Sequence, residues 1–280
     1  MKVHANVMVK NEEILLRQIL PIWKNYPIDE FVFYDDLSID ATADVIKDVL
    51  GDRATILENK QQVVFNESHN RSMMLEYSRS NNADYVIAID ADELVSSSFL
   101  NNFGKILESN SKVDIQYFWY NVVGGDLKNY RQDPSYLENN RTFVLPMEHT
   151  GRFDLSQWKY HTPRTPPVNL PKVRVKKVGF LHLQSMNERF YALKQLWYKH
   201  FEFKNYNHSV EFVNSRYDVV VNGLDFNPKP TPEQIISGIN IPKELNSSFD
   251  EMEKAKGYKD FIQKNYNEEL VTFGKKYLTD

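Results

Sequence analysis

Short apolar runs alternate with amphipathic stretches through the first ninety residues of the chain. One predicted strand ends at Val9, and three others cover residues 31–34, 54–57 and 85–89. Between them, apolar residues recur every three or four positions and predict helices over residues 12–20, 40–50 and 66–80. We expect Pro21 to interrupt the first helix and Gly51 to end the second. This alternation predicts an α/β fold with a doubly wound, mostly parallel central sheet flanked by helices, and such sheets bind ligands where their strands end.

The pattern is looser after residue 95. It predicts strands over residues 113–123 and 173–183. Helical stretches are predicted over residues 187–204, 231–238 and 249–277. Prolines are concentrated in residues 161–171, which predicts an extended loop there. We therefore expect one domain over residues 1–205, made of halves 1–95 and 96–205, followed by a helical C-terminal extension over 206–280.

Composition narrows the chemistry and the partners. The 280 residues include no cysteine, so any metal must be held by Asp, Glu, His or amide oxygen. A net charge of −4 is not typical of a nucleic-acid-binding protein, and we expect no such partner. No apolar run approaches the roughly 18 residues of a membrane span, and the N-terminus lacks the features of a signal peptide. These observations predict a cytoplasmic protein with at most peripheral membrane contact.

Two acidic clusters directly follow predicted strands. Asp35 and Asp36 open the segment D-D-L-S-I-D-A-T after the second strand, and Asp90, Asp92 and Glu93 follow the fourth. Carboxylates brought together repel one another unless a cation or hydrogen-bond donors compensate, and a divalent metal such as Mg²⁺ or Mn²⁺ suits oxygen ligands. Asp, Ser and Thr after a strand also form turns and helix caps, so a structural interpretation of the first cluster stays open.

Both clusters resemble motifs of one enzyme family. Residues 35–42 resemble the D-D-x-S-x-D-x-T motif of glycosyltransferase family 2, and Asp90-Ala91-Asp92 resembles the D-x-D motif of nucleotide-sugar transferases with the GT-A fold. Residues 9–13 resemble the family's first strand and turn, and the three motifs occur in the family's order. The resemblance is clear over residues 3–95 and looser to about residue 205. It implies a GT-A catalytic domain over 1–205, with a nucleotide-binding half over 1–95 and an acceptor half over 96–205.

The resemblance also implies roles for individual residues. Around the ends of the first two strands it implies a nucleotide site formed by Val9, Asn11, Glu12, Asp35 and Asp36. Asp36 would hold the nucleotide base, with Asp35 supporting it. Asp90 would contact the ribose or the metal-bound diphosphate, and Asp92 would ligate the metal, either Mn²⁺ or Mg²⁺.

The second half offers further candidates. Residues 180–184 resemble the C-terminal histidine segment of relatives, in which His182 would be another metal ligand; the alternative is a histidine hydrogen-bonded within the core. Arg189, Lys194 and Lys199 follow on a predicted helix and would face the diphosphate. The alternative for them is a solvated helix face.

The family resemblance implies an inverting, single-displacement reaction. A nucleoside-diphosphate sugar, with a UDP-sugar favoured, would donate to a hydroxyl of a glycan, lipid-linked or protein acceptor, as in polysaccharide biosynthesis. A carboxylate would act as base towards that hydroxyl. The candidates between the aromatic strand and His182 are Asp133, Glu138, Glu148 and Asp154. Asp154 resembles the family's base motif, and Glu148 is the next choice.

Two rival functions fit parts of the pattern. Asp90-x-Asp92 after an apolar strand also resembles the nucleophile motif of haloacid-dehalogenase phosphatases, although Leu94 stands where those enzymes carry Thr or Val. A nucleotide- or sugar-binding module without catalysis is the other alternative. Release of phosphate from an aryl phosphate would identify a phosphatase. Nucleotide binding without turnover would identify a binding module.

Overall fold

The chain folds into two compact units. The computed structural model describes residues 1–59, 66–131, 140–149, 163–222, 228–272 and 274–278. One unit, called here the sheet unit, comprises Met1–Trp119, Asn139–Leu181 and Pro232–Ile241. The other, the helical unit, comprises Tyr120–Glu138, His182–Thr231 and Pro242–Asp280.

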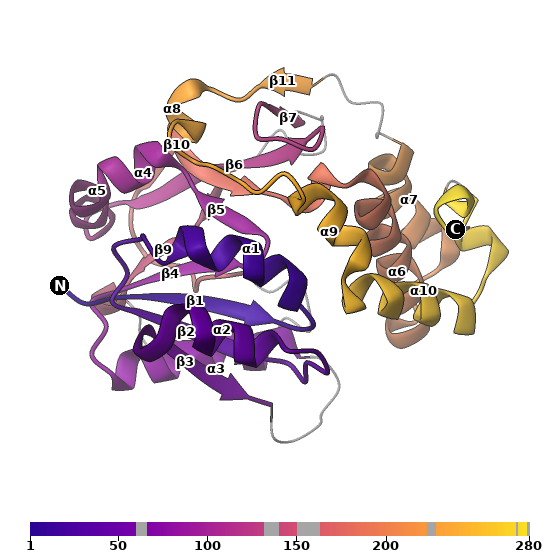
Figure 1. The fold of residues 1–280 in the computed structure, drawn as a ribbon, viewed down its shortest axis with the longest axis horizontal. Coiled ribbons are helices and arrows are strands. Elements are labelled where there is room, and N and C mark those ends of the chain that lie inside the picture. Colours follow the sequence, from indigo (N-terminus) through magenta and orange to yellow (C-terminus); the bar gives the residue numbers. More distant parts are fainter. Residues whose placement is uncertain (60–65, 132–139, 150–162, 223–227, 273, 279–280) are drawn as a thin grey trace. The chain divides into compact units, whose positions relative to one another are not determined.

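Five strands form the main sheet of the sheet unit, in the order β3-β2-β1-β4-β9 (Figure 1). β1 (Val3–Val9) lies between β2 (Glu30–Asp35) and β4 (Tyr85–Asp90) and runs parallel to both. β3 (Ala54–Glu58) is parallel to β2, whereas β9 (Val144–Pro146) is antiparallel to β4. The four parallel strands are those expected from the apolar runs, so the predicted α/β class is confirmed.

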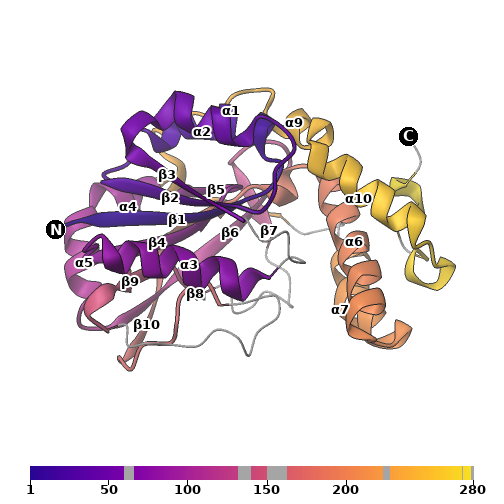
Figure 2. The same ribbon diagram turned by 90° about the horizontal axis from the view of Figure 1, so that it is seen from below.

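Helices cover both faces of this sheet. Figure 2 shows α1 (Glu13–Trp23) and α2 (Thr42–Leu50) on one face and α3 (Glu67–Ser80) on the other. Successive side chains of a strand point to opposite faces, so β2 needs apolar residues at consecutive positions. Phe31 stacks on Trp23 of α1 with ring centroids 6.0 Å apart, and Val32 packs with Met74 of α3. β2 is therefore apolar throughout because it is buried on both sides.

The helix boundaries follow the expected signals in two cases and not in the third. Gly51 ends α2 at a φ of +56°, and the Asn66 side chain caps α3 by accepting a hydrogen bond from the His69 backbone N–H at 3.1 Å. Contrary to the prediction, Pro21 lies inside α1, which continues to Trp23. Trp23 is fully buried, and its Nε1 donates to the Glu93 carbonyl at 3.0 Å. Burial of this large side chain helps to offset the roughly 3 kcal/mol that an interior proline costs.

A second sheet in the sheet unit carries an aromatic core. It contains β5 (Glu93–Val95), β10 (Lys172–His182) and the first part of β6 (Asp114–Val123), with β8 (Asn140–Thr142) paired to β6. Phe143 stacks on Phe180 with centroids 3.7 Å apart, and Tyr117 is buried beside them. The remaining helices of this unit are α4 (Ser97–Asn101), α5 (Phe103–Asn110) and α8 (Glu233–Ile236).

The helical unit is built around α6 (Glu188–Tyr206). Its other elements are α7 (Val210–Asn222), α9 (Leu245–Glu251), α10 (Glu253–Lys264) and the short strands β7 (Asn129–Arg131) and β11 (Pro228–Pro230), which pair with each other. Leu196 of α6 packs with Ile262 of α10 and with Val271. A helical C-terminal region is thus confirmed, while the domain boundary at residue 205 stays a prediction.

A methyl group at residue 274 would strain this packing. A Cβ on Gly274 would lie 2.5 Å from the Cδ2 atom of Leu196, which is fully buried. We expect Gly274→Ala to lower the free energy of unfolding by about 1–3 kcal/mol through overpacking, measured by urea denaturation. The control is Gly104→Ala on α5, where nothing lies within 4 Å, and we expect it to add about 0.5–1 kcal/mol. Equal urea midpoints for the two variants would contradict this account of residue 274.

Two buried histidines should make stability depend on pH. Burial lowers the pKa of His4 and of His200 below the ordinary value of 6.5, against a smaller opposing effect of Glu30 on His4. Between the lowered and ordinary pKa values the unfolded chain binds more protons than the folded chain. The contribution of the two neutral histidines to the free energy of unfolding is therefore complete above pH 6.5 and is lost as the pH falls below that value.

The test compares urea midpoints at pH 7.5 and pH 5.5. We expect the wild-type midpoint to fall between these pH values, and to fall less in His4→Gln, which cannot titrate. A wild-type midpoint that rises on acidification would overturn the expected direction.

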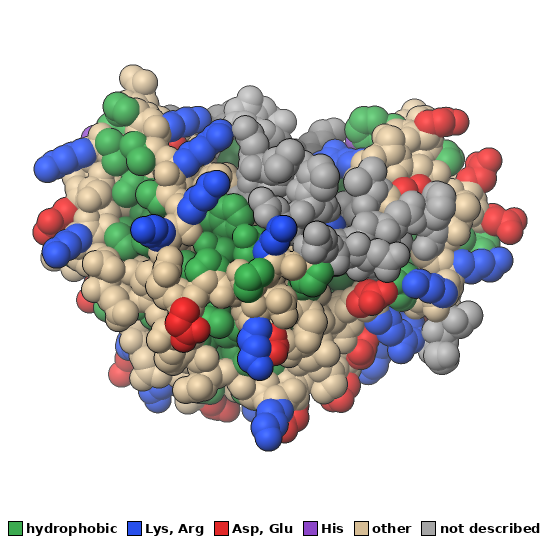
Figure 3. All heavy atoms as spheres, turned by 90° about the horizontal axis from the view of Figure 1, so that it is seen from above, with side chains coloured by type: hydrophobic (Ala, Val, Ile, Leu, Met, Phe, Trp, Pro, Cys, Tyr) green, Lys and Arg blue, Asp and Glu red, His purple; other side chains and the backbone are tan. Residues whose placement is uncertain are grey.

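The surface carries charges of both signs. On the face drawn in Figure 3, Lys and Arg side chains lie between hydrophobic patches, and acidic side chains occur on the same face. Within the ranges that the structure describes, no helix is long and apolar enough to cross a membrane.

Candidate functional site

The candidate site lies where β1, β2 and β4 end. In the parallel register Val9 pairs with Asp35 and Met8 pairs with Asp90. Asp35 and Asp90 therefore terminate the two strands that flank β1. The structure brings the two acidic clusters to one edge of the main sheet, as the sequence suggests.

The first cluster ties two neighbouring turns together. The Asn11 backbone N–H donates to Ser38 Oγ at 2.9 Å, and Asn11 Oδ1 accepts the Ile39 N–H at 2.8 Å. The Glu12 backbone N–H donates to Thr42 Oγ1 at 2.8 Å. Asn11, Ser38, Glu12 and Thr42 thus join the β1–α1 turn to the β2–α2 turn. For Ser38 and Thr42 these bonds support the structural interpretation.

The two leading aspartates have different surroundings. Asp35 Oδ1 accepts the Ser38 backbone N–H at 2.9 Å and so stabilises its own turn. Asp36 is buried: its Oδ1 accepts from Asn59 Nδ2 at 3.0 Å, and its Oδ2 lies 3.4 Å from Lys10 Nζ. A carboxylate has about four acceptor positions, so Asp36 retains capacity for a ligand's N–H or O–H donors. Its backbone N–H donates to the Val9 carbonyl, which holds it at the end of β1.

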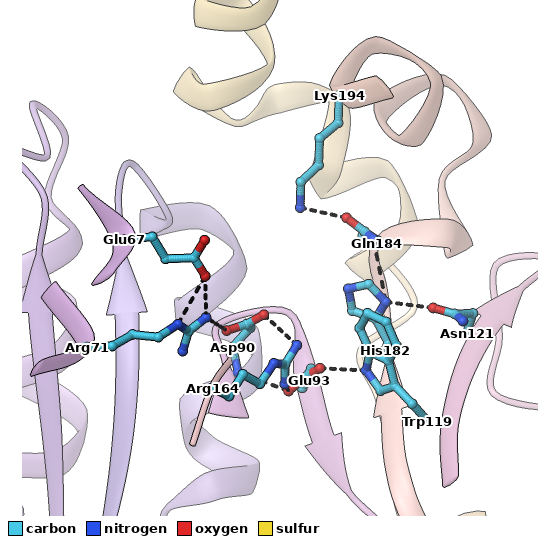
Figure 4. A network of polar contacts seen from close by, with 10 residues as sticks. All are labelled: Glu67, Arg71, Asp90, Glu93, Trp119, Asn121, Arg164, His182, Gln184 and Lys194. Carbon is cyan, nitrogen blue, oxygen red and sulfur yellow. Dashed lines mark hydrogen bonds and ion pairs between the residues drawn. The ribbon is translucent and has the colours of Figure 1, made fainter. Parts of the chain in front are cut away.

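The second cluster is compensated by arginine (Figure 4). Arg164 Nη2 donates to Asp90 Oδ2 at 2.6 Å, and Arg71 Nη2 lies 3.6 Å from Asp90 Oδ1. Arg71 is held in turn by Glu67, one helical turn earlier on α3, at 2.8 Å. Each oxygen of Asp90 therefore faces a guanidinium group.

Glu93 is the buried anchor of this network. Its side chain is 0% exposed, and its Oε2 accepts from Arg164 Nη1 at 2.5 Å and from the Asp90 backbone N–H at 2.9 Å. Its Oε1 accepts from Trp119 Nε1 at 2.6 Å. The Arg164 guanidinium also lies over the rings of Trp119 and Phe143, at 5.2 and 5.0 Å from their centroids. A buried carboxylate needs this degree of compensation.

The surrounding charges keep Arg164 protonated. Burial by itself would lower the pKa of its guanidinium, but the carboxylates of Asp90 and Glu93, together with the charge of Asp92, raise it, and the net direction is upward. The group is thus a permanent cation among three acids. Neither Arg164 nor Arg71 is among the site residues predicted from the sequence. The only signals were a lone arginine in a proline-rich loop and a Glu-x-x-x-Arg pair on a helix.

A divalent cation was the compensating charge that the acidic clusters suggested. In the part of the chain that the structure describes, no three His, Asp or Glu side chains are grouped to hold one. Asp90 and Asp92 are nevertheless hard oxygen ligands. Mg²⁺ commonly uses only one or two carboxylates and completes its shell with water and substrate phosphates. The pair of aspartates therefore fits such a metal in ligand type and number.

His182 belongs to the helical unit. It is buried, and its Nδ1 lies 2.7 Å from Asn121 Oδ1 (Figure 4). Gln184 Nε2 lies 3.5 Å from the same ring nitrogen, and Lys194 Nζ donates to Gln184 Oε1 at 2.6 Å. If Nδ1 carries the proton donated to Asn121, Nε2 is the nitrogen that has a lone pair for a ligand. The role of His182 as a metal ligand stays a prediction.

The basic candidates on α6 differ in burial. Lys199 is 0% exposed, and its Nζ donates to Asp218 Oδ1 at 2.5 Å inside the helical unit. This pairing favours a structural role for Lys199. Lys194 is bound to Gln184, and Arg189 lies in the first turn of α6. Diphosphate binding by any of the three stays a prediction.

Of the four candidate bases, Glu148 is the one that lies within the described residues. Glu148 follows β9, whose antiparallel register pairs Pro146 with Tyr85, the first residue of β4. Glu148 is therefore at the amino end of β4 and is not brought to the edge where Asp90 lies. An antiparallel neighbour reverses which end of the strand its flanking residues reach. Asp154, Asp133 and Glu138 lie outside the described residues.

Comparison with known proteins assigns the family. Residues 7–163 match the family model described as glycosyl transferase family 2, which is more than half of the chain. No curated protein matches significantly. The fold resembles that of Staphylococcus aureus TarS residues 1–349, at 12% identity over 98% of this chain and 83% of that one, with a TM-score of 0.42.

Other solved structures are similarly remote. TarS 1–349 in complex with UDP-GlcNAc is 13% identical over 98% of this chain and 84% of that one, with a TM-score of 0.40. Mycobacterium tuberculosis glucosyl-3-phosphoglycerate synthase with phosphoglyceric acid is 17% identical over 42% and 44%, with a TM-score of 0.32. The assignment rests on the family match together with the three motifs at one sheet edge. This chain belongs to glycosyl transferase family 2 and is a GT-A glycosyltransferase of the nucleotide-sugar type.

Proposed function

We propose that the enzyme transfers a sugar from a UDP-sugar to a hydroxyl acceptor, with inversion at the anomeric carbon and with a divalent metal. The observation that carries the proposal is the parallel register in which Asp35 and Asp90 end the two strands that flank β1, with Asp36 hydrogen-bonded through its backbone N–H to Val9. The family match favours this reaction over the phosphatase alternative.

The chain's own residues divide the work of binding the donor. Asp36, buried and held by Asn59, accepts hydrogen bonds from the nucleoside. Asp90 and Asp92 hold the metal, which when bound neutralises charge on the leaving diphosphate. Arg71 and Arg164 offset part of the negative charge of this acidic edge, which reduces its repulsion of an anionic donor.

The acceptor hydroxyl needs a base opposite the leaving group. Asp154 is the proposed base, from its resemblance to the family motif. The acceptor is a glycan, lipid-linked or protein hydroxyl. The anomeric configuration of the product, followed by proton NMR during early turnover, tests inversion: retention of the donor's configuration would exclude single displacement.

Nucleotide binding is tested by thermal melting with UDP, GDP, CDP and dTDP, each with and without Mn²⁺. A ligand at a hundred times its Kd adds about 2.7 kcal/mol of stability, which raises Tm by about 5 °C in a chain of this size. We expect this shift for UDP and only with Mn²⁺. A shift with another nucleotide would reassign the donor. No shift with any nucleotide would reject the proposed donor site.

A further inference from the structure

Arg164 occupies the position in the acidic cluster where a cation is needed. Its side chain is 13% exposed and spans two carboxylates, with Nη2 on Asp90 and Nη1 on Glu93. The two carboxylates differ in access: Glu93 is 0% exposed, whereas the side chain of Asp90 is 32% exposed. A cation arriving from solvent can therefore reach Asp90 and not Glu93.

We propose that Arg164 is the resident counter-cation of this cluster and that it competes with a divalent metal for Asp90. The inference rests on the proposed metal role of Asp90 and Asp92. Both oxygens of Asp90 already face guanidinium groups. A metal at Asp90 either displaces Arg164 Nη2 or binds beside its positive charge, and each costs binding free energy. Arg164 thus weakens metal binding to the free enzyme.

Glu93 and two aromatic rings keep Arg164 in place during this exchange. Its second nitrogen remains on the buried Glu93, which is itself fixed by Trp119 Nε1. The Trp119 and Phe143 rings contact the guanidinium face. Releasing Asp90 therefore does not release Arg164 from the site. A nucleoside diphosphate carries negative charge that compensates the added metal, so metal and donor are expected to bind together.

The experiment titrates Mn²⁺ alone into the nucleotide-free enzyme and follows free Mn²⁺ by electron paramagnetic resonance. We expect Arg164→Gln to lower the Kd for Mn²⁺ about tenfold, which corresponds to about 1.4 kcal/mol. A purely structural role for Arg164 predicts the opposite, because a disturbed site binds metal less well. A Kd in Arg164→Gln that is within twofold of wild type, or higher, overturns the proposal.

Two further variants test whether the change in the Mn²⁺ Kd is specific to Arg164. Arg141→Gln removes another arginine that lies over the Trp119 ring, at 5.7 Å, and whose Nη1 donates to the Asn140 carbonyl; it should leave the Mn²⁺ Kd unchanged. If Arg164→Gln does not fold, the double variant Glu93→Gln/Arg164→Gln removes both buried charges and still frees Asp90. We expect its Kd to fall at least about threefold, and an unchanged Kd there also overturns the proposal.

A further variant separates this inference from the proposed function. Mn²⁺ binding that is lost in Asp92→Ala but unchanged in Arg164→Gln would reject the role of Arg164 and retain the metal site. Absence of Mn²⁺ binding in wild type together with binding in Arg164→Gln would support competition strongly. Absence of binding in every variant would reject both the metal site and the competition.

Discussion

Replacing Asp92 with alanine is expected to lower kcat/KM for sugar transfer about 1,000-fold. Asp92 is partly buried beside Asp90 at the end of β4 and is the proposed metal ligand. Metal neutralisation of a leaving group is worth several kcal/mol, and about 4 kcal/mol corresponds to three orders of magnitude in rate. The same variant should lose the Mn²⁺-dependent rise in Tm with UDP. Steady-state release of the nucleoside diphosphate measures the rate.

The control for this loss is Asp48→Ala, which removes an exposed carboxylate on α2. It should retain wild-type kcat/KM and the wild-type Tm shift. If Asp92→Ala kept more than a tenth of wild-type activity, a metal held by Asp92 would not be needed for transfer. In that case Arg71 and Arg164 would supply the positive charge next to Asp90.

The largest effect on stability is expected from Glu93→Ala. Glu93 is fully buried and accepts hydrogen bonds from Arg164, from Trp119 Nε1 and from the Asp90 backbone N–H. Removing it takes from Arg164 its fully buried carboxylate, leaving Asp90, and takes from the Trp119 indole N–H its acceptor on Glu93. Breaking a buried ion pair in this way costs about 3–5 kcal/mol. We expect a loss of that size in the free energy of unfolding, measured by urea denaturation.

Two further variants test whether the loss of stability in Glu93→Ala comes from the lost hydrogen bonds and ion pair of Glu93. Glu93→Gln keeps the shape and one acceptor oxygen, so its loss should be smaller than that of Glu93→Ala. Glu108→Ala removes an exposed glutamate on α5 and should change the unfolding free energy by no more than about 0.5 kcal/mol. A Glu93→Ala variant as stable as Glu108→Ala would show that the buried network contributes little to folding.

Some of the candidate site could be predicted from local sequence. Asp35, Asp36 and Asp90 come directly after or at the ends of strands whose apolar runs are unambiguous, and parallel strands separated by helices must end at the same edge. Residues adjacent in the chain are therefore enough to predict that both acidic clusters lie at the same edge of the sheet.

Local sequence did not predict features that depend on the direction of a neighbouring strand or on a side chain distant in the chain. Glu148 was a candidate base by its position in the chain, but β9 runs antiparallel to β4 and carries Glu148 to the amino end of that strand. Pro21 was expected to end a helix, but the burial of Trp23 two residues later extends it. In both cases tertiary packing decided between locally acceptable alternatives.

The sequence by itself determined the α/β class, the four parallel strands, the family and the edge of the sheet where the acids gather, because each depends on periodicity or on motifs of adjacent residues. It also showed that the cluster of Asp90, Asp92 and Glu93 requires a compensating charge. Only the tertiary structure decided which cation is resident: Arg164, 71 residues after Glu93 in the chain, reaches the cluster through a loop. Long-range electrostatic pairing leaves no periodic pattern in a sequence, since it depends on which side chains the fold brings within hydrogen-bond distance.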